Sequence, residues 1–342
     1  MNSSIVRTKR SLLVTGGLGF IGLSLVRKLH QDFDIVVLDW KDRLEAKSEL
    51  SELTRLGANF HRGDIADPEV WQRIEKCDFV FHGAAQVSAI TSGLDPVRDF
   101  KSNAFGTFLV AEYARRHSAR VIYCNSIRIY DTDAVEVAIR ERGAVSEACA
   151  TIVQSRKPQP PFAISKYIGE ECLLSYARMH SLPVISFRMS GITGPGQIGS
   201  KVHGWISHLI GCAVNGITFT VYGSGKQSRD VLHISDYLEL IEIALNKFDY
   251  LSGEGGAVYN VGGGPSNELS IEQVAHMLRE EHRLDLNLVY EDCRMSEPTH
   301  YVSDCTLIAS KGWQPTQTDP QSLISEIVDW YKKRRRNDNR IS

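Results

Sequence analysis

The fold of this 342-residue chain is decided by one stretch near its start, Leu12-Leu13-Val14-Thr15-Gly16-Gly17-Leu18-Gly19-Phe20-Ile21-Gly22. The apolar and β-branched residues at its beginning predict a buried strand, and the residues after Gly19 predict a helix. Gly16, Gly19 and Gly22 have the spacing GxxGxxG, which permits a tight turn and close approach of a phosphate to the backbone. Because a helix N-terminus also offers N–H donors, the stretch predicts a dinucleotide-binding turn.

An acidic residue ends the second predicted strand, in Val36-Val37-Leu38-Asp39. A carboxylate at this place can hold both hydroxyls of an adenosine ribose, which favours NAD over NADP. The nearby bases Lys41 and Arg43 are the feature that would suit NADP instead. Asp64 ends the third predicted strand, where it is expected either to contact adenine or to cap the strand.

The first half of the chain alternates short apolar runs with amphipathic stretches, which predicts a doubly wound parallel sheet of the Rossmann type, an α/β fold. The expected strands are residues 11–15, 34–39, 58–61, 78–82, 120–126, 183–188 and 258–261, and the expected helices are 21–30, 69–76, 96–117, 162–180, 270–283 and 321–333. We expect residues 10–188 to form an NAD-binding domain to which 232–262 return, and 189–231 with 263–335 to form a smaller, discontinuous substrate-binding lobe.

The composition is that of an ordinary globular protein, with 42% hydrophobic and 23% charged residues and a formal net charge of −2. A charge so close to zero gives no general attraction to nucleic acid or to a membrane surface, and no apolar run is long enough to span a bilayer. The seven cysteines show no CxxC pair and no metal-ligand spacing. We therefore expect a cytoplasmic protein with reduced thiols and without a metal site.

Two later segments are expected to bring reactive side chains to the same edge of the sheet. Ser126 ends the predicted strand 120–126, and strand ends face the ligand crevice in this architecture. Phe162 and Lys166 are four residues apart on a predicted helix, hence on one face of it. The three side chains should meet near the nicotinamide ring, unless Ser126 only caps its strand and Lys166 is a solvated helix lysine.

Together these motifs resemble the extended short-chain dehydrogenase/reductase family, whose members mostly act on nucleotide sugars, over about residues 11–330. Within that family the resemblance is to the CDP-paratose 2-epimerase group (CDP-tyvelose epimerases), in the segments 81–88, 103–107, 225–227 and 229–233 and in the long segment between Tyr130 and Pro161. The resemblance implies tightly held NAD that takes a hydride from a sugar carbon and returns it to the other face of a transient keto sugar. It also implies a role in carbohydrate biosynthesis.

The family resemblance assigns roles residue by residue. A serine and a lysine of the family match Ser126 and Lys166, and Arg229 matches an arginine that contacts the pyrophosphate. The implied cofactor contacts are Gly16, Gly19, Phe20, Ile21, Gly22, Asp39, Asp64, Ile65, Ala84, Ala85, Asn103 and Lys166, and the implied substrate contacts are Gln86, Ser126, Arg229 and Arg294. A further family arginine falls at Thr299, and Arg229 could instead form an ion pair with Asp230. Helices 96–117 and 162–180 are expected to pair across a homodimer.

The chain departs from the family at its catalytic centre, because Phe162 stands where the family has the tyrosine that acts as base. Loss of a positioned acid/base typically costs a factor of about 10²–10⁴ in rate. Three explanations remain. Another group (Tyr123, Cys124, Tyr130, a histidine or water) takes over the proton; the chain is a natural NAD and nucleotide-sugar binding protein; or the tyrosine was replaced deliberately. Dehydration or plain oxidoreduction of the sugar are the alternative reactions.

Overall fold

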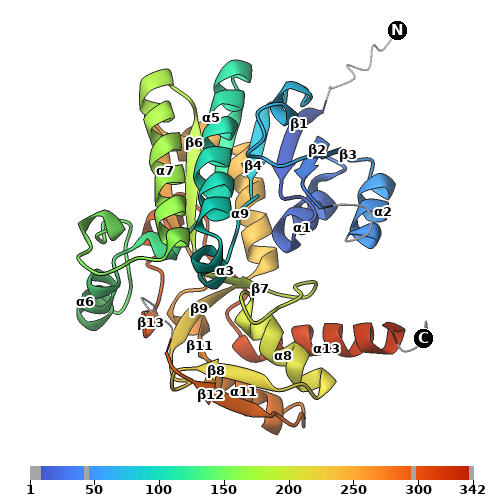
Figure 1. Cartoon of the computed structure of the whole chain (residues 1–342), viewed down its shortest axis with the longest axis vertical. Coiled ribbons are helices and arrows are strands. Elements are labelled where there is room, and N and C mark those ends of the chain that lie inside the picture. The colour runs from blue at the N-terminus through green and yellow to red at the C-terminus, as the bar shows by residue number, and fades with distance from the viewer. Residues whose placement is uncertain (1–8, 42–45, 294–297, 339–342) are drawn as a thin grey trace.

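The computed structural model of this chain describes residues 9–41, 46–293 and 298–338. Its largest element is a sheet of seven parallel strands in the order β10-β6-β5-β4-β1-β2-β3 (Figure 1). The strands are β1 (Arg10–Thr15), β2 (Phe33–Asp39), β3 (Asn59–Arg62), β4 (Phe79–His82), β5 (Arg120–Ser126), β6 (Val184–Met189) and β10 (Ala257–Val261). The order runs outward in both directions from the neighbours β1 and β4, so the predicted doubly wound fold is confirmed.

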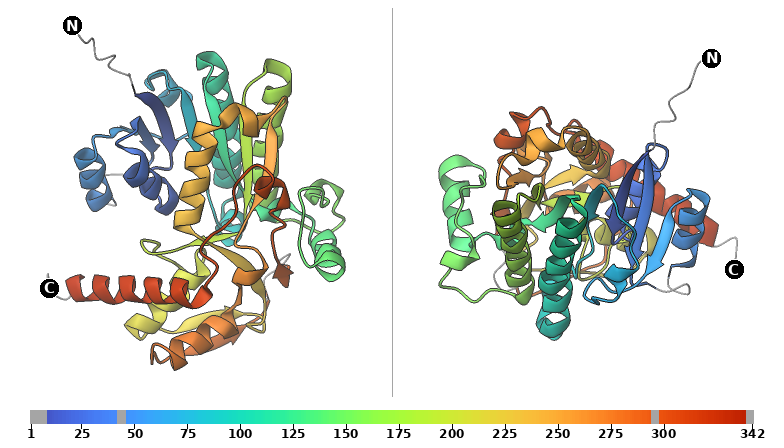
Figure 2. Two further views of the ribbon diagram at one scale, coloured as in Figure 1. Left: turned by 180° about the vertical axis from the view of Figure 1, so that it is seen from behind. Right: turned by 90° about the horizontal axis from the view of Figure 1, so that it is seen from above.

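Helices cover both faces of this sheet (Figure 2). On one face lie α1 (Phe20–Leu29) and α9 (Ile234–Asn246), and on the other α5 (Gly106–His117) and α7 (Pro161–His180) lie side by side. Successive strand residues point to opposite faces, so Leu12 and Val14 pack with the α1 side while Leu13 packs with the α5 side. Burial on both faces explains why the strands read as continuous apolar runs.

The predicted helix over residues 96–117 is present but is not uniform. It consists of α4 (Pro96–Phe100), a π-helical turn (Lys101–Phe105) and α5. The π turn carries Asn103, and such turns often occur at functional sites. A shorter helix, α3 (Ala89–Leu94), lies between β4 and α4.

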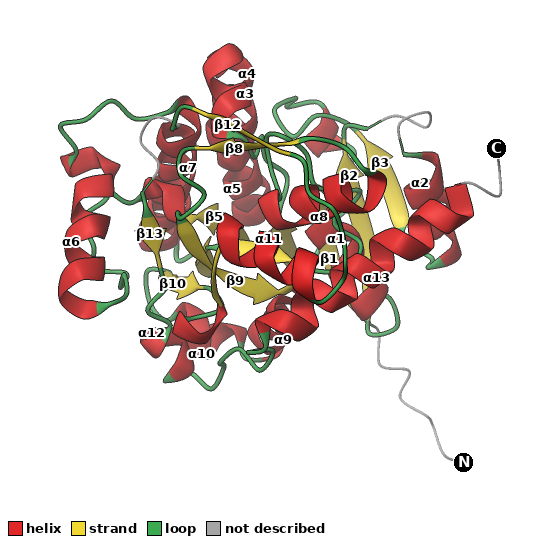
Figure 3. Ribbon diagram, turned by 90° about the horizontal axis from the view of Figure 1, so that it is seen from below, coloured by secondary structure: helices red, strands yellow, loops and turns green. Residues whose placement is uncertain are grey.

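A second group of elements lies beyond the carboxyl ends of the strands (Figure 3). Its helices are α8 (Trp205–Asn215), α11 (Ile271–Glu280) and α13 (Pro320–Asp338), which share one apolar core. Two small sheets complete it, one of β8 (Phe219–Tyr222) with β12 (Leu288–Glu291), the other of β7 (Gly191–Thr193), β9 (Ser228–His233), β11 (Glu268–Ser270) and β13 (His300–Tyr301).

The expected helix at residues 69–76 is wrong, because the structure has only a short 3-10 turn, Val70–Gln72. Side chains satisfy the backbone here in place of helical hydrogen bonds. The Trp71 indole donates to the Ile65 carbonyl at 2.9 Å, and the Tyr113 hydroxyl accepts from the Cys77 N–H and donates to the Glu75 carbonyl. Apolar burial at these positions produced the helix-like pattern without a helix.

Several helices were not predicted from the sequence. They are α2 (Lys47–Arg55), α6 (Thr132–Arg142), α10 (Phe248–Ser252) and α12 (Thr306–Ala309), in addition to α3, α8 and α9. Of these, α6 stands at the side of the molecule within the long segment that separates β5 from α7 (Figure 3). Within the described ranges, every helix is too short or too polar to span a bilayer.

Candidate active site

The glycine turn between β1 and α1 has the shape of a phosphate cradle. Gly16 has φ +74°, and a Cβ there would lie 2.8 Å from the Ala84 backbone nitrogen. A Cβ on Gly22 would lie 2.3 Å from the Gly16 carbonyl oxygen. Helix α1 starts at Gly19 with no side-chain cap, so its first N–H groups remain open to an anion. Side chains are thus excluded from the space that a pyrophosphate needs, and Phe20 and Ile21 form the first turn of the helix.

Asp39 lies at the end of β2 and holds the glycine turn in place. Its carboxylate accepts from the Leu18 N–H at 3.0 Å and from the Lys41 N–H at 3.2 Å, and its side chain is buried. Each carboxylate oxygen has a further lone pair, so the group can still accept from ribose hydroxyls.

Asp64 and Ile65, which follow β3, both make contacts within the protein. Asp64 is exposed and accepts from the Ala66 N–H at 2.9 Å, which is the strand-end turn that the sequence left as an alternative. Ile65 is buried, and a Cβ on Gly106 would lie 2.8 Å from its Cδ1 atom. In this structure Ile65 therefore packs between β3 and α5, and its backbone carbonyl accepts from the Trp71 indole.

Asn103 ties the loop after β4 to α7. Its amide oxygen accepts from the Gln86 N–H at 2.8 Å, and its amide nitrogen donates to the Gln86 carbonyl at 2.9 Å. The same nitrogen lies 3.1 Å from Asp99 Oδ1 and 3.1 Å from Ser165 Oγ. Asn103 thereby fixes the loop that carries Ala84 and Ala85, and the Gln86 amide folds back onto Ser88.

The three expected catalytic positions lie on elements that touch. Helix α7 packs against β5 and against the 3-10 turn Ile127–Ile129 that follows Ser126. Ser126 is half-buried, and its hydroxyl oxygen accepts from the Arg128 N–H at 3.2 Å. The Phe162 ring is buried in the first turn of α7.

The side chain of Lys166 is held against β5. Its ammonium donates to the Cys124 carbonyl at 2.6 Å and lies 4.2 Å from the centre of the Tyr123 ring. The other contact of that ring is a stacked His82, with ring centres 5.3 Å apart. Burial lowers the pKa of Lys166 to about 8, although nearby negative groups, Glu170 among them, oppose the shift.

The side chains considered as replacements for the missing hydroxyl are poorly suited to proton transfer. Burial raises the pKa of Cys124 to about 11 and raises the pKa values of Tyr123 and Tyr130 well above the usual tyrosine value. Burial lowers the pKa of His82 to about 3, and the imidazole is bonded between Thr15 and Thr107. None of these four groups changes its charge near neutral pH.

Arg229 and Asp230 are neighbours on β9, and their side chains form hydrogen bonds on opposite sides of the strand. The Arg229 guanidinium donates to the carbonyls of Ser228 and Pro298, each at 2.7 Å. The Asp230 carboxylate is buried and accepts from the N–H groups of Gly264 and Ser303, so it faces away from the neighbouring arginine. The expected contact at Arg294 lies outside the described residues.

Sequence reasoning missed a buried ion pair next to the site. Glu170 follows Lys166 by one helical turn, and its carboxylate lies 2.5 Å from Arg188 Nη2 on β6. The same carboxylate accepts from Asn125 Nδ2 at 2.7 Å and from Ser186 Oγ at 2.6 Å. The sequence did contain a signal for this pair. Residues 162, 166 and 170 lie on one face of α7, and a glutamate on a buried helix face needs a partner.

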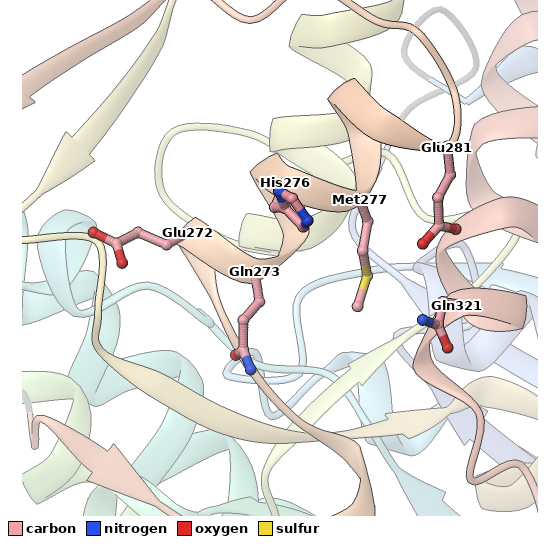
Figure 4. A pocket seen from close by; sticks show the side chains of 6 residues that line it. All are labelled: Glu272, Gln273, His276, Met277, Glu281 and Gln321. Atoms are coloured by element: carbon pink, nitrogen blue, oxygen red, sulfur yellow. The ribbon is translucent and has the colours of Figure 1, made fainter.

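A hollow of about 360 Å³ lies beside α11 (Figure 4). It is lined by Glu272, Gln273, His276, Met277, Glu281 and Gln321. Figure 1 shows α11 at the end of the molecule that is remote from α5 and α7. Among the residues described, no cluster of three or more His, Cys, Asp or Glu side chains is arranged to hold a metal.

A parallel sheet with a phosphate cradle after β1, a serine at the end of β5 and a lysine on the adjacent helix α7 defines the class, a dinucleotide-binding α/β protein. The chain belongs to the NAD dependent epimerase/dehydratase family, whose model matches residues 12–262. The family expected from the sequence is thus confirmed, and with it the NAD-dependent chemistry of its members.

The relatives include two kinds of sugar-nucleotide enzyme. The chain is 30% identical to CDP-paratose 2-epimerase of Salmonella typhi, over 93% of this chain and 98% of that protein. It is also 30% identical to dTDP-glucose 4,6-dehydratase of Haemophilus influenzae, over 94% and 97%. Among solved structures, UDP-glucose 4-epimerase of Thermotoga maritima with UDP-glucose superposes with a TM-score of 0.81 at 25% identity, over 95% of this chain and 99% of that one.

Proposed function

We propose that this chain epimerises a nucleotide-linked sugar with NAD, through a transient keto sugar and with an atypical acid/base arrangement. The observation that carries the proposal is the contact of α7, bearing Phe162 and Lys166, with the strand end that bears Ser126. NAD, when bound, supplies the acceptor and then the donor of the sugar's hydride. The glycine cradle and the uncapped start of α1 fit its pyrophosphate, and Asp39 fits its adenosine ribose.

In this proposal Ser126 orients the reacting hydroxyl of the sugar. Its oxygen accepts from the Arg128 N–H, and its O–H can rotate to donate to the sugar. Lys166 provides a positive charge beside the nicotinamide ribose. Phe162 fills the space of the family's tyrosine but cannot carry the proton, which then has to leave through Ser126 and water. The expected cost of about 10²–10⁴ in rate makes a slow enzyme or a binding protein the second candidate.

The turn after Ser126 favours epimerisation over dehydration. Expelling a hydroxyl group as water needs an additional acid and base near the sugar. This turn presents Ile127 and Arg128, and the Ile127 side chain is buried. Epimerisation requires only that the keto sugar turn over in its site, so it needs no additional acid or base from this turn.

We further propose that residues 10–188 with 232–262 bind NAD, while 189–231 with 263–335 hold the sugar nucleotide. Arg229 supports this division because it grips the carbonyls of Pro298 and Thr299, on the segment that precedes β13. Arg229 and Arg294 are the proposed diphosphate contacts. All seven cysteines are free thiols, which supports a cytoplasmic location.

A homodimer through α5 and α7 is the proposed assembly. Large apolar side chains on the outer surface of these helices and the preceding turns are exposed: Val97 by 63%, Phe100 by 49%, Phe105 by 39%, Phe108 by 39%, Ile164 by 42% and Ile168 by 38%. A cluster of this kind on a pair of adjacent helices is typical of a surface that pairs with another copy.

The function is tested by NMR of the NAD-loaded protein with a panel of nucleotide sugars in heavy water, beside a Phe162→Tyr variant. Epimerisation by hydride return predicts an inverted sugar without deuterium at the inverted carbon. Deuterium at that carbon contradicts it, and stoichiometric loss of NAD indicates plain oxidoreduction. Saturable binding of NAD and sugar nucleotide without any product identifies a binding protein.

A further inference from the structure

The hydroxyl of Tyr130 joins three elements inside the protein. It donates to Asn260 Oδ1 on β10 at 2.6 Å and accepts from Arg188 Nη1 on β6 at 3.0 Å. The Tyr130 side chain is buried and also stacks on the Tyr301 ring at a centre distance of 6.5 Å. A single hydroxyl therefore fixes the start of the segment 130–160 to the ends of two sheet strands.

The same two partners hold the middle of that segment. Asn260 donates its amide nitrogen to the Val145 carbonyl at 2.7 Å, and its backbone N–H donates to Glu147 Oε1 at 2.7 Å. Arg188 Nη1 lies 3.3 Å from the Glu147 carbonyl. Removing the hydroxyl of Tyr130 thus leaves Asn260 Oδ1 without this donor and takes one of two acceptors from Arg188 Nη1, which keeps the Glu147 carbonyl.

The segment lines a small hollow, of about 10 Å³, beside the candidate active site. The hollow is lined by residues 127–128, directly after Ser126, and by residues 159–160, which Pro161 separates from Phe162. Pro298, whose carbonyl Arg229 holds, lines another side of it. The hollow therefore touches the neighbours of the proposed reacting and diphosphate-binding residues.

The remaining wall comes from the segment itself, through Tyr130, Thr132 and Val135. Thr132 and Val135 belong to the first turn of α6, the helix that the sequence did not predict. These side chains therefore line the same hollow as the turn after Ser126 and as Pro298.

From this arrangement we propose that Tyr130, through Arg188 and Asn260, is a positioning residue that determines how the sugar ring is held. This inference rests on the proposed function and names the part of the site that selects the sugar. Tyr130 touches no reacting atom in it; the hydroxyl fixes the wall that the ring packs against.

The test compares the affinity for a nucleotide sugar with that for the diphosphate alone. The probes are UDP-glucose against UDP and CDP-glucose against CDP, measured by calorimetry with saturating NAD. Tyr130→Phe should reduce the affinity ratio of sugar nucleotide to diphosphate by about tenfold, the loss expected for one buried hydrogen-bonding group, while NAD affinity stays unchanged. A purely structural role would lower the Tm without changing the ratio.

Tyr113→Phe is the matched control. The Tyr113 hydroxyl is also buried and also makes two hydrogen bonds, to the Cys77 N–H and the Glu75 carbonyl, just before the amino end of β4. It should cost comparable stability and leave the ratio unchanged. If Tyr130→Phe does not fold, Asn260→Ser releases the same wall and should lower the ratio in the same way.

Two failures are distinguishable. A wild-type chain that binds neither nucleotide sugar more tightly than its diphosphate overturns the proposed function, and this inference with it. A wild-type chain that does so, while Tyr130→Phe keeps the same ratio, overturns the role of Tyr130 alone.

Discussion

At the scale of single residues, the proposed chemistry depends on Phe162, which stands where the family resemblance expects a tyrosine. The helix that carries Phe162 and Lys166 packs against the strand that ends at Ser126 and against the turn that follows it. A single hydroxyl group is therefore the change that tests the proposal most directly.

Phe162→Tyr should therefore raise the turnover of the proposed sugar substrate by about 10²–10⁴-fold, because it supplies an acid/base at the reacting hydroxyl. The measurement is the single-turnover rate of epimer formation with NAD loaded. Phe187→Tyr, which places the same hydroxyl on a buried ring of β6, is the control and should give no gain. Equal rates for Phe162→Tyr and the wild type would show that the proton already has another route.

The burial of Lys166 predicts how the stability of the protein depends on pH. Burial lowers its pKa to about 8, whereas an unfolded lysine titrates near 10.4. Between these values the unfolded chain binds more protons than the folded one, so this lysine makes stability rise with pH across that window. Urea unfolding of Lys166→Met at several pH values should show a smaller rise than the wild type, and the exposed Lys333→Met should not differ. Parallel curves for Lys166→Met and the wild type would contradict the buried lysine.

At the scale of elements, the strands of the large sheet were predictable, whereas the short strands of the second group and several connections were not. All seven strands of the large sheet lie where their apolar runs predicted, because burial on both faces leaves an unmistakable pattern. The crossover at 69–76 is buried through Trp71 and Tyr113 without a helix, and α6 has too few buried positions to be conspicuous in sequence. Spacing predicted Ser126 and Lys166 on touching elements; the Glu170–Arg188 pair and the Tyr130 network depend on contacts between distant segments.

The role of the glycine turn in NAD binding can be tested against a second glycine that has a similar backbone φ. Gly16 and Gly57 have nearly the same φ, +74° and +73°, but only at Gly16 would a Cβ meet backbone atoms, those of Ala84 at 2.8 Å. Gly16→Ala should abolish NAD binding and destabilise the fold by more than the roughly 1–2 kcal/mol of left-handed strain. Gly57→Ala should cost that strain alone and keep NAD affinity, as judged by calorimetry and urea unfolding. Retained NAD binding in Gly16→Ala would contradict the cradle.

At the scale of the whole molecule, the exposed apolar side chains of α5 and α7 predict the assembly. Phe108→Glu combined with Ile168→Glu places charges in the proposed dimer surface and should give a monomer by light scattering. Val289→Glu, on the similarly exposed strand β12, should leave the assembly unchanged. A monomeric wild-type protein in the same light-scattering measurement would contradict the proposed dimer.

The seventh strand of the large sheet has a consequence for how this chain is made. Strand β10 pairs with β6, yet α8, β9 and α9 are synthesised between them. A growing polypeptide on the ribosome therefore carries β6 with one open edge until residue 261 has emerged. We therefore expect that the first half of the chain does not fold by itself, and that fragments that stop before Ala257 are recovered as aggregates rather than as a small NAD-binding protein.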